Sequence, residues 1–262
     1  MQKQQLNNAL HIGGSLKTAL NGQYSLSASG VIQEAMKLTQ KHFWHFLPAT
    51  IAFTLANLAL FLLILAIQTG EPLVVLQSFV DTSKQNEQTD SAIRIAMFFA
   101  TILSAPLYAG ASLMGLSHAI GFRTKPWHIV KGLTYGLTVT VAVCLISLLE
   151  NISNQFIPLL GLFIGITLSM TILLICEKRL SLLKAMQISF RATVKKILPF
   201  IGVYFVLAGM FLFSYATAGI ALIWVLPFMF NVKGVLYREM FGVGIEIIIT
   251  DENGNNDEIF HA

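Results

Sequence analysis

The sequence predicts an all-α integral membrane protein with six transmembrane helices and with basic amphipathic helices at the membrane interface. Three observations predict this fold class. Of the 262 residues, 55% are hydrophobic and only 11% are charged, whereas a soluble domain usually has about 25% charged residues. The mean hydropathy is +0.70. Apolar runs long enough to cross about 30 Å of hydrocarbon recur along the chain, and most basic residues fall between them.

Six segments are expected to cross the membrane, each close to the ~20 apolar residues that a helix needs for this. The apolar stretch 198–230 is too long for one span. Because the small residues of 215–219 interrupt it, we divide it into two spans joined by a tight turn. The expected spans are residues 46–67, 91–120, 133–149, 157–176, 198–214 and 219–236.

The positions of the basic residues predict the orientation, because Lys and Arg concentrate on the cytoplasmic side of a membrane. With six spans, all of the 17 Lys and Arg residues except Lys84 and Arg94 fall on one side. Five spans would send Lys233 and Arg238 to the other side, so six are preferred. Both termini are then cytoplasmic, and the expected location is a bacterial inner membrane. The pI near 9.1 follows from this loop charge and does not indicate a nucleic-acid partner.

Both ends of the chain are expected outside the membrane domain of residues 29–242. Residues 1–28 lack the apolar core of a signal peptide and are rich in Gln, Asn, Gly and Ser. They are expected to form a disordered cytoplasmic tail. Residues 243–262 are expected to form a second cytoplasmic tail, either disordered or folded as a short hairpin.

Two amphipathic segments, 29–45 and 179–197, are expected to lie on the membrane surface. In the first, Val31 and Ala35 are among the side chains expected to dip into the headgroups. The second segment is basic, and each cation near an anionic surface contributes about 1 kcal/mol to binding. It therefore either anchors the bundle or forms a specific site for anionic phospholipid. The candidate headgroup contacts are Lys184, Arg191, Lys195 and Lys196.

A repeat is one interpretation of the chain's organisation. An interfacial segment, a Leu-Pro pair and a long apolar span follow one another at Leu47-Pro48 and again at Leu198-Pro199. Three parallel units, each an interfacial helix followed by a helical hairpin, would account for this pattern. Chance similarity between apolar segments is the alternative.

Polar side chains and prolines at membrane depth are functional candidates, because burying polar groups in hydrocarbon is costly. Such groups also serve as hydrogen-bonding contacts between helices, and proline also occurs in membrane helices without a functional role. Lys233 is expected at the cytoplasmic end of the sixth span and Glu150 at the outer turn after the third. No charged side chain is then expected in the middle of a span, which counts against an ion-coupled pump. The candidates are Asn57, Pro106, His118, Pro227 and Asn231.

Sequence signatures of catalysis and of metal binding are missing. The chain has no nucleophile elbow, no zinc-protease motif and no phosphate-binding loop. His42 and His45 have no carboxylate at metal-site spacing, and Cys144 and Cys176 lie in apolar runs as small hydrophobic residues do. We expect a protein that is not an enzyme and holds neither cofactor nor metal.

Short motifs in the second half of the chain carry a resemblance. They are Ala185-Met186-Gln187-Ile188-Ser189, Leu198-Pro199, Pro227 and Tyr237-Arg238-Glu239-Met240-Phe241-Gly242. With Ala105-Pro106-Leu107 and residues 127–132, they resemble an uncharacterised family of predicted six-span bacterial inner-membrane proteins, over most of the chain apart from its tails. The resemblance implies six helices and an inner-membrane location, and it supplies no catalytic residue.

Two functions remain open on this reasoning. The first is a non-enzymatic inner-membrane protein that binds lipid or a partner membrane protein and supports envelope assembly or homeostasis. The second is a small transporter or channel with proline-broken even-numbered helices. The basic interfacial segments favour the first function.

Overall fold

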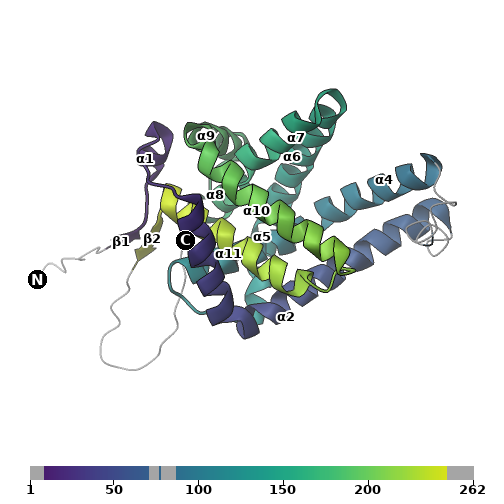
Figure 1. The fold of residues 1–262 in the computed structure, drawn as a ribbon, viewed down its shortest axis with the longest axis horizontal. Helices are drawn as coiled ribbons and strands as arrows, with labels where there is room; N and C mark the ends of the chain where they lie inside the picture. The colour runs from purple at the N-terminus through teal and green to yellow at the C-terminus, as the bar shows by residue number, and fades with distance from the viewer. Residues whose placement is uncertain (1–8, 71–76, 78–86, 247–262) are drawn as a thin grey trace, which may run out of the picture.

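A computed structural model describes residues 9–70, 77 and 87–246, and most of these residues are helical (Figure 1). Among these described residues, four helices are long and apolar enough to cross a membrane, and a bent helix pair would be a fifth. The prediction of a helical protein with several membrane-spanning segments is confirmed at this level. The elements in chain order are β1 (Ala9–Ile12), α1 (Leu16–Asn21), α2 (Ala28–Thr69), α4 (Glu87–Leu103), α5 (Ala105–Ala119), the 3-10 helix η2 (Pro126–Tyr135), α6 (Gly136–Phe156), α7 (Pro158–Leu168), α8 (Thr171–Lys178), α9 (Leu182–Lys195), α10 (Ile197–Ala216), α11 (Leu222–Phe241) and β2 (Val243–Glu246).

The first interfacial segment and the first span form one helix, α2, rather than two. Pro48 lies inside this helix, and the ribbon bends in its first half (Figure 1). Proline bends a helix because it lacks an N–H and its ring clashes with the preceding turn. Val31 and Ala35 are buried in the protein core. The expectation that these two side chains face lipid headgroups is therefore wrong.

The second expected span, 91–120, is broken into α4 and α5, which meet at Ser104 at a bend of 57°. Pro106 lies in the first turn of α5, where its missing N–H costs no helical hydrogen bond. The third expected span corresponds to α6, preceded by η2. The fourth corresponds to α7 and α8, which together form an apolar segment, Leu159–Lys178.

The expected division of residues 198–230 is present, because α10 ends at Ala216 and α11 begins at Leu222. α11 is not among the helices that are apolar enough to cross a membrane by composition. It carries Lys233, Arg238 and Glu239, and most of its side chains are buried against its neighbours. It is the central helix of the structure, with α10 beside it (Figure 1).

The expected disorder of residues 1–28 is wrong for residues 9–28. β1 pairs antiparallel with β2, with Ala9 opposite Glu246. Ala19 of α1 is fully buried, and the Tyr24 hydroxyl donates to the Ala192 carbonyl of α9 at 2.8 Å. Burial raises the pKa of Tyr24 to about 12, so this donor stays protonated across the physiological pH range. The expectations for residues 1–8 and 247–262 lie outside the described residues.

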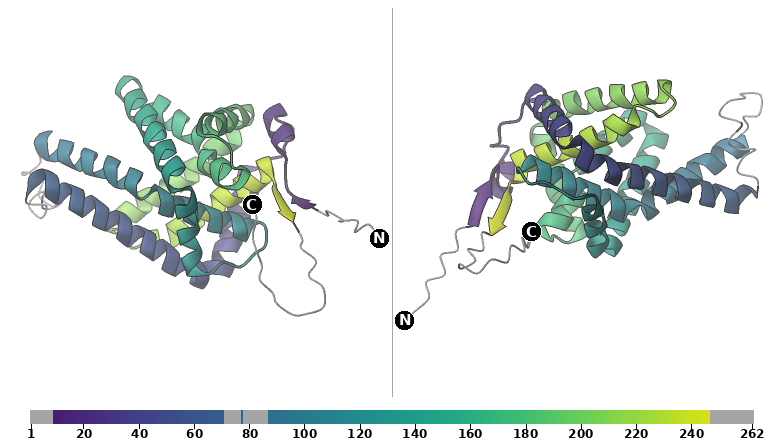
Figure 2. Two further views of the ribbon diagram at one scale, coloured as in Figure 1. Left: turned by 180° about the vertical axis from the view of Figure 1, so that it is seen from behind. Right: turned by 90° about the horizontal axis from the view of Figure 1, so that it is seen from below.

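The core is organised where α5 crosses α11. A Cβ atom on Gly115 would overlap the backbone carbonyl of Phe230, and one on Gly234 would overlap the carbonyl of Gly115. Only glycine permits such close backbone contact. From this crossing, α4 with the second half of α2 and the α6–α7 pair extend as two separate arms (Figure 2).

Candidate functional site

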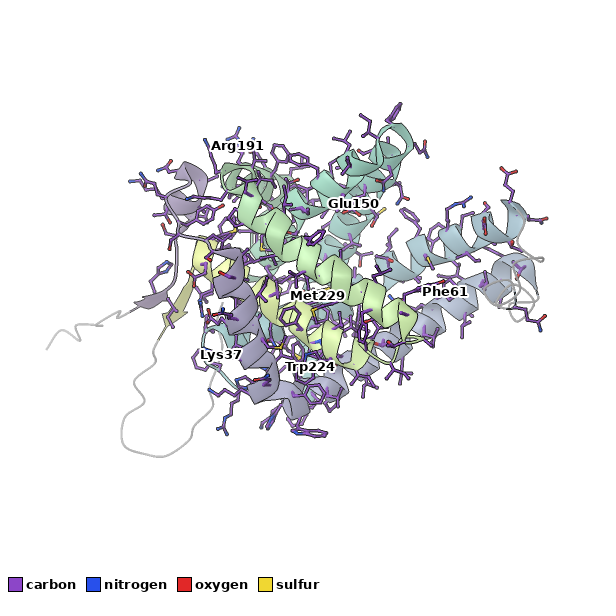
Figure 3. The ribbon with its side chains drawn as sticks, viewed as in Figure 1. Lys37, Phe61, Glu150, Arg191, Trp224 and Met229 are labelled. Atoms are coloured by element: carbon purple, nitrogen blue, oxygen red, sulfur yellow. The ribbon has the colours of Figure 1, made fainter. Side chains whose placement is uncertain are left out.

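A cavity of about 710 Å³ lies where the two arms meet α10 and α11. Its volume is in the range of ligand-binding pockets, about 300–1,000 Å³. Most of its wall is apolar, with residues such as Phe53, Val143, Leu226 and Met229, and a few polar groups interrupt it. Figure 3 shows Glu150 on the α6–α7 arm and Met229 on the central helix.

Lys233 is the cation of this cavity. Its side chain lines the wall, the residue is only 9% exposed, and its Nζ atom lies 4.6 Å from the centre of the Tyr108 ring. In the described part of the chain, no carboxylate forms an ion pair with it. A buried cation without a counter-ion is costly, and an aromatic face offsets only part of that cost. The arrangement favours an anionic group in the cavity.

The position of Lys233 corrects an expectation from the sequence. Because α11 continues to Phe241, Lys233 lies near the middle of this helix and not at its end. Glu150 likewise lies within α6, which continues to Phe156 before the turn. Both charged residues line one cavity. Glu150 is thus inside α6 rather than in the turn that follows it, and Lys233 is a buried charge within α11.

Two glycines of α7 make room for the polar residues of α6. A Cβ atom on Gly165 would lie 2.7 Å from Oε1 of Glu150, and one on Gly161 would overlap the Asn154 amide. Small residues such as these allow close helix packing in membrane proteins. The structure shows that they admit polar side chains of the facing helix to the cavity wall, where Glu150 is half-buried.

The third side of the cavity comes from the broken helix pair. Asn57 of α2 donates from Nδ2 to Oγ of Ser104 at 2.8 Å, and both residues line the cavity. Ser104 is the residue at the 57° bend. Asn57 therefore joins two helices by a hydrogen bond, and this bond lies on the cavity wall.

A buried hydrogen-bond network holds α11 from its other side. His118 is fully buried, with Nδ1 3.0 Å from Oδ1 of Asn231 and Nε2 2.8 Å from the Thr124 hydroxyl. Asn231 donates from Nδ2 to the Thr39 hydroxyl of α2 at 2.9 Å. The His42 ring stacks on His118 at 4.3 Å. Asn231 and Lys233 are two positions apart in α11, which separates their side chains by about 200° around the helix axis. Because the network holds Asn231 on one side of α11, it directs Lys233 to the opposite side, toward the cavity.

A second polar cluster joins the helix ends. Arg238 donates to both carboxylate oxygens of Glu34, at 2.7 and 2.8 Å, and to the Ala119 carbonyl at 2.6 Å. The Tyr237 hydroxyl donates to Oε2 of Glu177 at 2.6 Å. The bidentate pair between Arg238 and Glu34 adds geometric specificity. This cluster ties the ends of α2, α5, α8 and α11 together, and we assign it a structural role.

The predicted site residues are not brought together in one place. Asn57 is at the cavity, Pro106 is in the turn beside it, and His118 and Asn231 form the network behind Lys233. α11 is continuous through Pro227. The basic residues of α9 and of its C-terminal end do not line the cavity, and Figure 3 shows Arg191 on the outside of the structure. They are Lys184, Arg191 and Lys195, which are exposed, and Lys196, which is half-buried.

Comparisons with protein-family models, with curated proteins and with solved structures found no match. The family resemblance therefore stays a prediction. Among the described residues, no group of three or more His, Cys, Asp or Glu side chains could hold a metal ion. A further cavity lies at the tips of α2 and α4, with Gln68, Glu87 and Arg94 among its lining residues.

Sequence reasoning missed Lys233 and Glu150 as cavity residues. The available signal was the separation of two positions between Asn231 and Lys233, which places them on opposite faces of one helix. Because Asn231 bonds to the neighbouring helices through His118 and Thr39, Lys233 faces the other way. The expected span ended at residue 236, which put Lys233 near the end of the helix. Because α11 continues to Phe241, Lys233 is in fact near its middle.

Proposed function

We propose that this is a non-enzymatic membrane protein that binds a phospholipid, with Lys233 as the contact for the headgroup phosphate. The observation that carries the proposal is a nearly fully buried lysine, without a described counter-ion, in a mostly apolar cavity. Lysine binds phosphate as a point charge through three N–H donors. The helices beside the cavity carry exposed apolar side chains, among them Leu103, Leu148 and Leu149, which suit acyl chains. Such binding would support envelope assembly or homeostasis.

The test of this proposal is native mass spectrometry of the purified protein with phosphatidylglycerol and, separately, with diacylglycerol. The wild type is expected to retain phosphatidylglycerol and to lose diacylglycerol. Lys233→Met should weaken phosphatidylglycerol binding about tenfold or more, since a hydrogen bond to a charged group contributes about 1.5–3 kcal/mol. Lys125→Met is the matched control, because Lys125 also lies over an aromatic ring, Trp127, but is exposed outside the cavity.

Two results would contradict this function. One is equal retention of phosphatidylglycerol by the wild type and Lys233→Met. The other is a protein that co-purifies at fixed stoichiometry in place of lipid, which would make the chain a subunit whose function lies with that partner. The exposed cations of α9, Lys184, Arg191 and Lys195, are proposed as a weaker surface contact for anionic phospholipid. Changing them to Gln should lower membrane association without removing the cavity adduct.

We further propose six membrane crossings in a bacterial inner membrane, with both termini cytoplasmic and with three units of an interfacial segment and a hairpin. The crossings are α2, the α4–α5 pair, α6, α7 with α8, α10 and α11. Charge asymmetry supports this topology. A reporter fused at the C-terminus is expected to be active in the cytoplasm. Activity of that reporter on the outer side would exclude an even number of crossings with a cytoplasmic N-terminus.

A small transporter is the second candidate, favoured by the bend between α4 and α5 beside the cavity. Broken helices line substrate sites in several transporter folds. Reconstituted protein would then move solute across liposomes, and Pro106→Ala would reduce the flux more than Pro227→Ala, because α11 is continuous. No flux across a broad panel of solutes would exclude this candidate.

A further inference from the structure

We propose that the cavity binds a zwitterionic headgroup, with a phosphate at Lys233 and a primary ammonium group at Glu150, as in phosphatidylethanolamine. This inference rests on the proposed function and names its ligand class. Lys233 and Glu150 line the same cavity. Within the described residues, each lacks an ion-pair partner. One ligand that carries both charges would compensate both side chains at once.

The environment of Glu150 suits an ammonium donor. Glu150 is half-buried, and its carboxylate lies against the backbone of Gly165, which has no side chain to displace it. In the described part of the chain it accepts no hydrogen bond from the protein, and the acids that do pair, Glu34, Glu177 and Glu239, contact Arg238 or Lys178 elsewhere. Its two oxygens are free to accept N–H donors of a ligand.

Asn154 adds a second acceptor on the same side. It lies one helical turn beyond Glu150, so both side chains project from the same face of α6, and both line the cavity. Its amide rests against Gly161 as the carboxylate rests against Gly165. A primary ammonium group has three N–H donors and can bond to both residues, whereas a trimethylammonium group has none.

The two sides of the cavity thus differ in the hydrogen-bonding groups that they present. On the side of α5 and α11, Lys233 lies over Tyr108 and donates. On the side of α6 and α7, Glu150 and Asn154 accept. Phosphatidylethanolamine and phosphatidylcholine carry the same charges, so only the hydrogen bonds of the ammonium group distinguish them here. Phosphatidylglycerol offers the phosphate and two neutral hydroxyl groups, but no ammonium group to pair with Glu150.

The experiment is competition among these three lipids, with identical acyl chains, for the full-length protein, read by native mass spectrometry. The wild type should retain phosphatidylethanolamine over both others. Glu150→Gln should lower that preference about tenfold or more, since charge-assisted hydrogen bonds are roughly twice as strong as neutral ones. It should leave phosphatidylglycerol binding intact. Asp90→Asn, which changes an exposed acid outside the cavity, is the control and should keep the preference.

The outcomes separate this inference from the proposed function. Equal retention of phosphatidylethanolamine and phosphatidylcholine by the wild type would overturn the zwitterion site, and this comparison needs no variant to fold. An unchanged preference in Glu150→Gln would overturn it as well. In both cases, a phosphatidylglycerol adduct that disappears in Lys233→Met would leave the phosphate site standing. Adducts that Lys233→Met does not alter would overturn the proposed function itself.

Discussion

Gly115→Ala is expected to destabilise the protein strongly, because the added methyl group has no space at the crossing of α5 and α11. The new Cβ atom would overlap the backbone carbonyl of Phe230, which belongs to the central helix. Backbone cannot rotate away as a side chain can, so α5 and α11 would have to separate. Overpacking of a core costs about 1–3 kcal/mol, and we expect the upper end of that range or more. Gly234→Ala should have the same effect, because a Cβ atom there would overlap the carbonyl of Gly115.

The measurement is the unfolding temperature of each variant in one detergent, followed by size-exclusion chromatography after heating. Gly209→Ala is the matched control, since no atom lies within 4 Å of the Cβ position on this residue of α10. Alanine has the higher helix propensity, so this control should equal or exceed the wild type. Equal unfolding temperatures for Gly115→Ala and Gly209→Ala would show that α5 and α11 do not cross this closely.

Asn231→Leu is expected to have the second largest effect. It removes the acceptor of His118 and the donor to Thr39, and all three residues are fully buried. A buried polar group that loses its partner costs about 1–3 kcal/mol, and here two groups lose one. Because the network sets the rotation of α11, the variant should also weaken the lipid adduct at Lys233.

The control for this variant is Asn151→Leu, which changes an exposed asparagine that bonds only within its own helix, at the Ser147 carbonyl. Unfolding temperature and the phosphatidylglycerol adduct are measured together. We expect both to fall in Asn231→Leu and neither to fall in Asn151→Leu. If Asn231→Leu is destabilised but keeps its full phosphatidylglycerol adduct, the network does not position Lys233 for lipid binding.

The membrane-spanning character of the chain was predictable, because a segment that crosses a membrane must be long and apolar enough to lie in lipid. The turn between α10 and α11 was predictable for a related reason, since the largely apolar stretch 198–230 is too long for one span and small residues mark the turn. The ends of helices were harder to predict. α2 runs from Ala28 to Thr69 through Pro48 because packing of Val31 and Ala35 continues the helix beyond its apolar part.

The order of residues 9–28 was not predictable from composition. Low hydrophobicity in this segment indicates disorder, but β1 is completed by β2 from the other end of the chain. Tyr24 and Ala19 pack against the folded helices. Such pairings between distant segments leave no local pattern in the sequence.

The cavity was only partly predictable. Asn57 was a candidate because a polar residue in an apolar run is costly, and it lies on the wall. Lys233 and Glu150 were assigned to span edges, since the sequence shows the apolar run and not the full helix. Gly161 and Gly165 give no local sign of the cavity, because the polar side chains that they make room for come from α6 and lie against them only in the folded chain.

The most direct test of the lipid site is an experimental structure of the protein in lipid nanodiscs that contain phosphatidylethanolamine and phosphatidylglycerol. We expect a phosphate group in the cavity with an oxygen within about 3 Å of Lys233 Nζ, the length of an N–H···O hydrogen bond. A cavity without lipid, in which Lys233 bonds to Glu150 directly or through water, would contradict the proposed function.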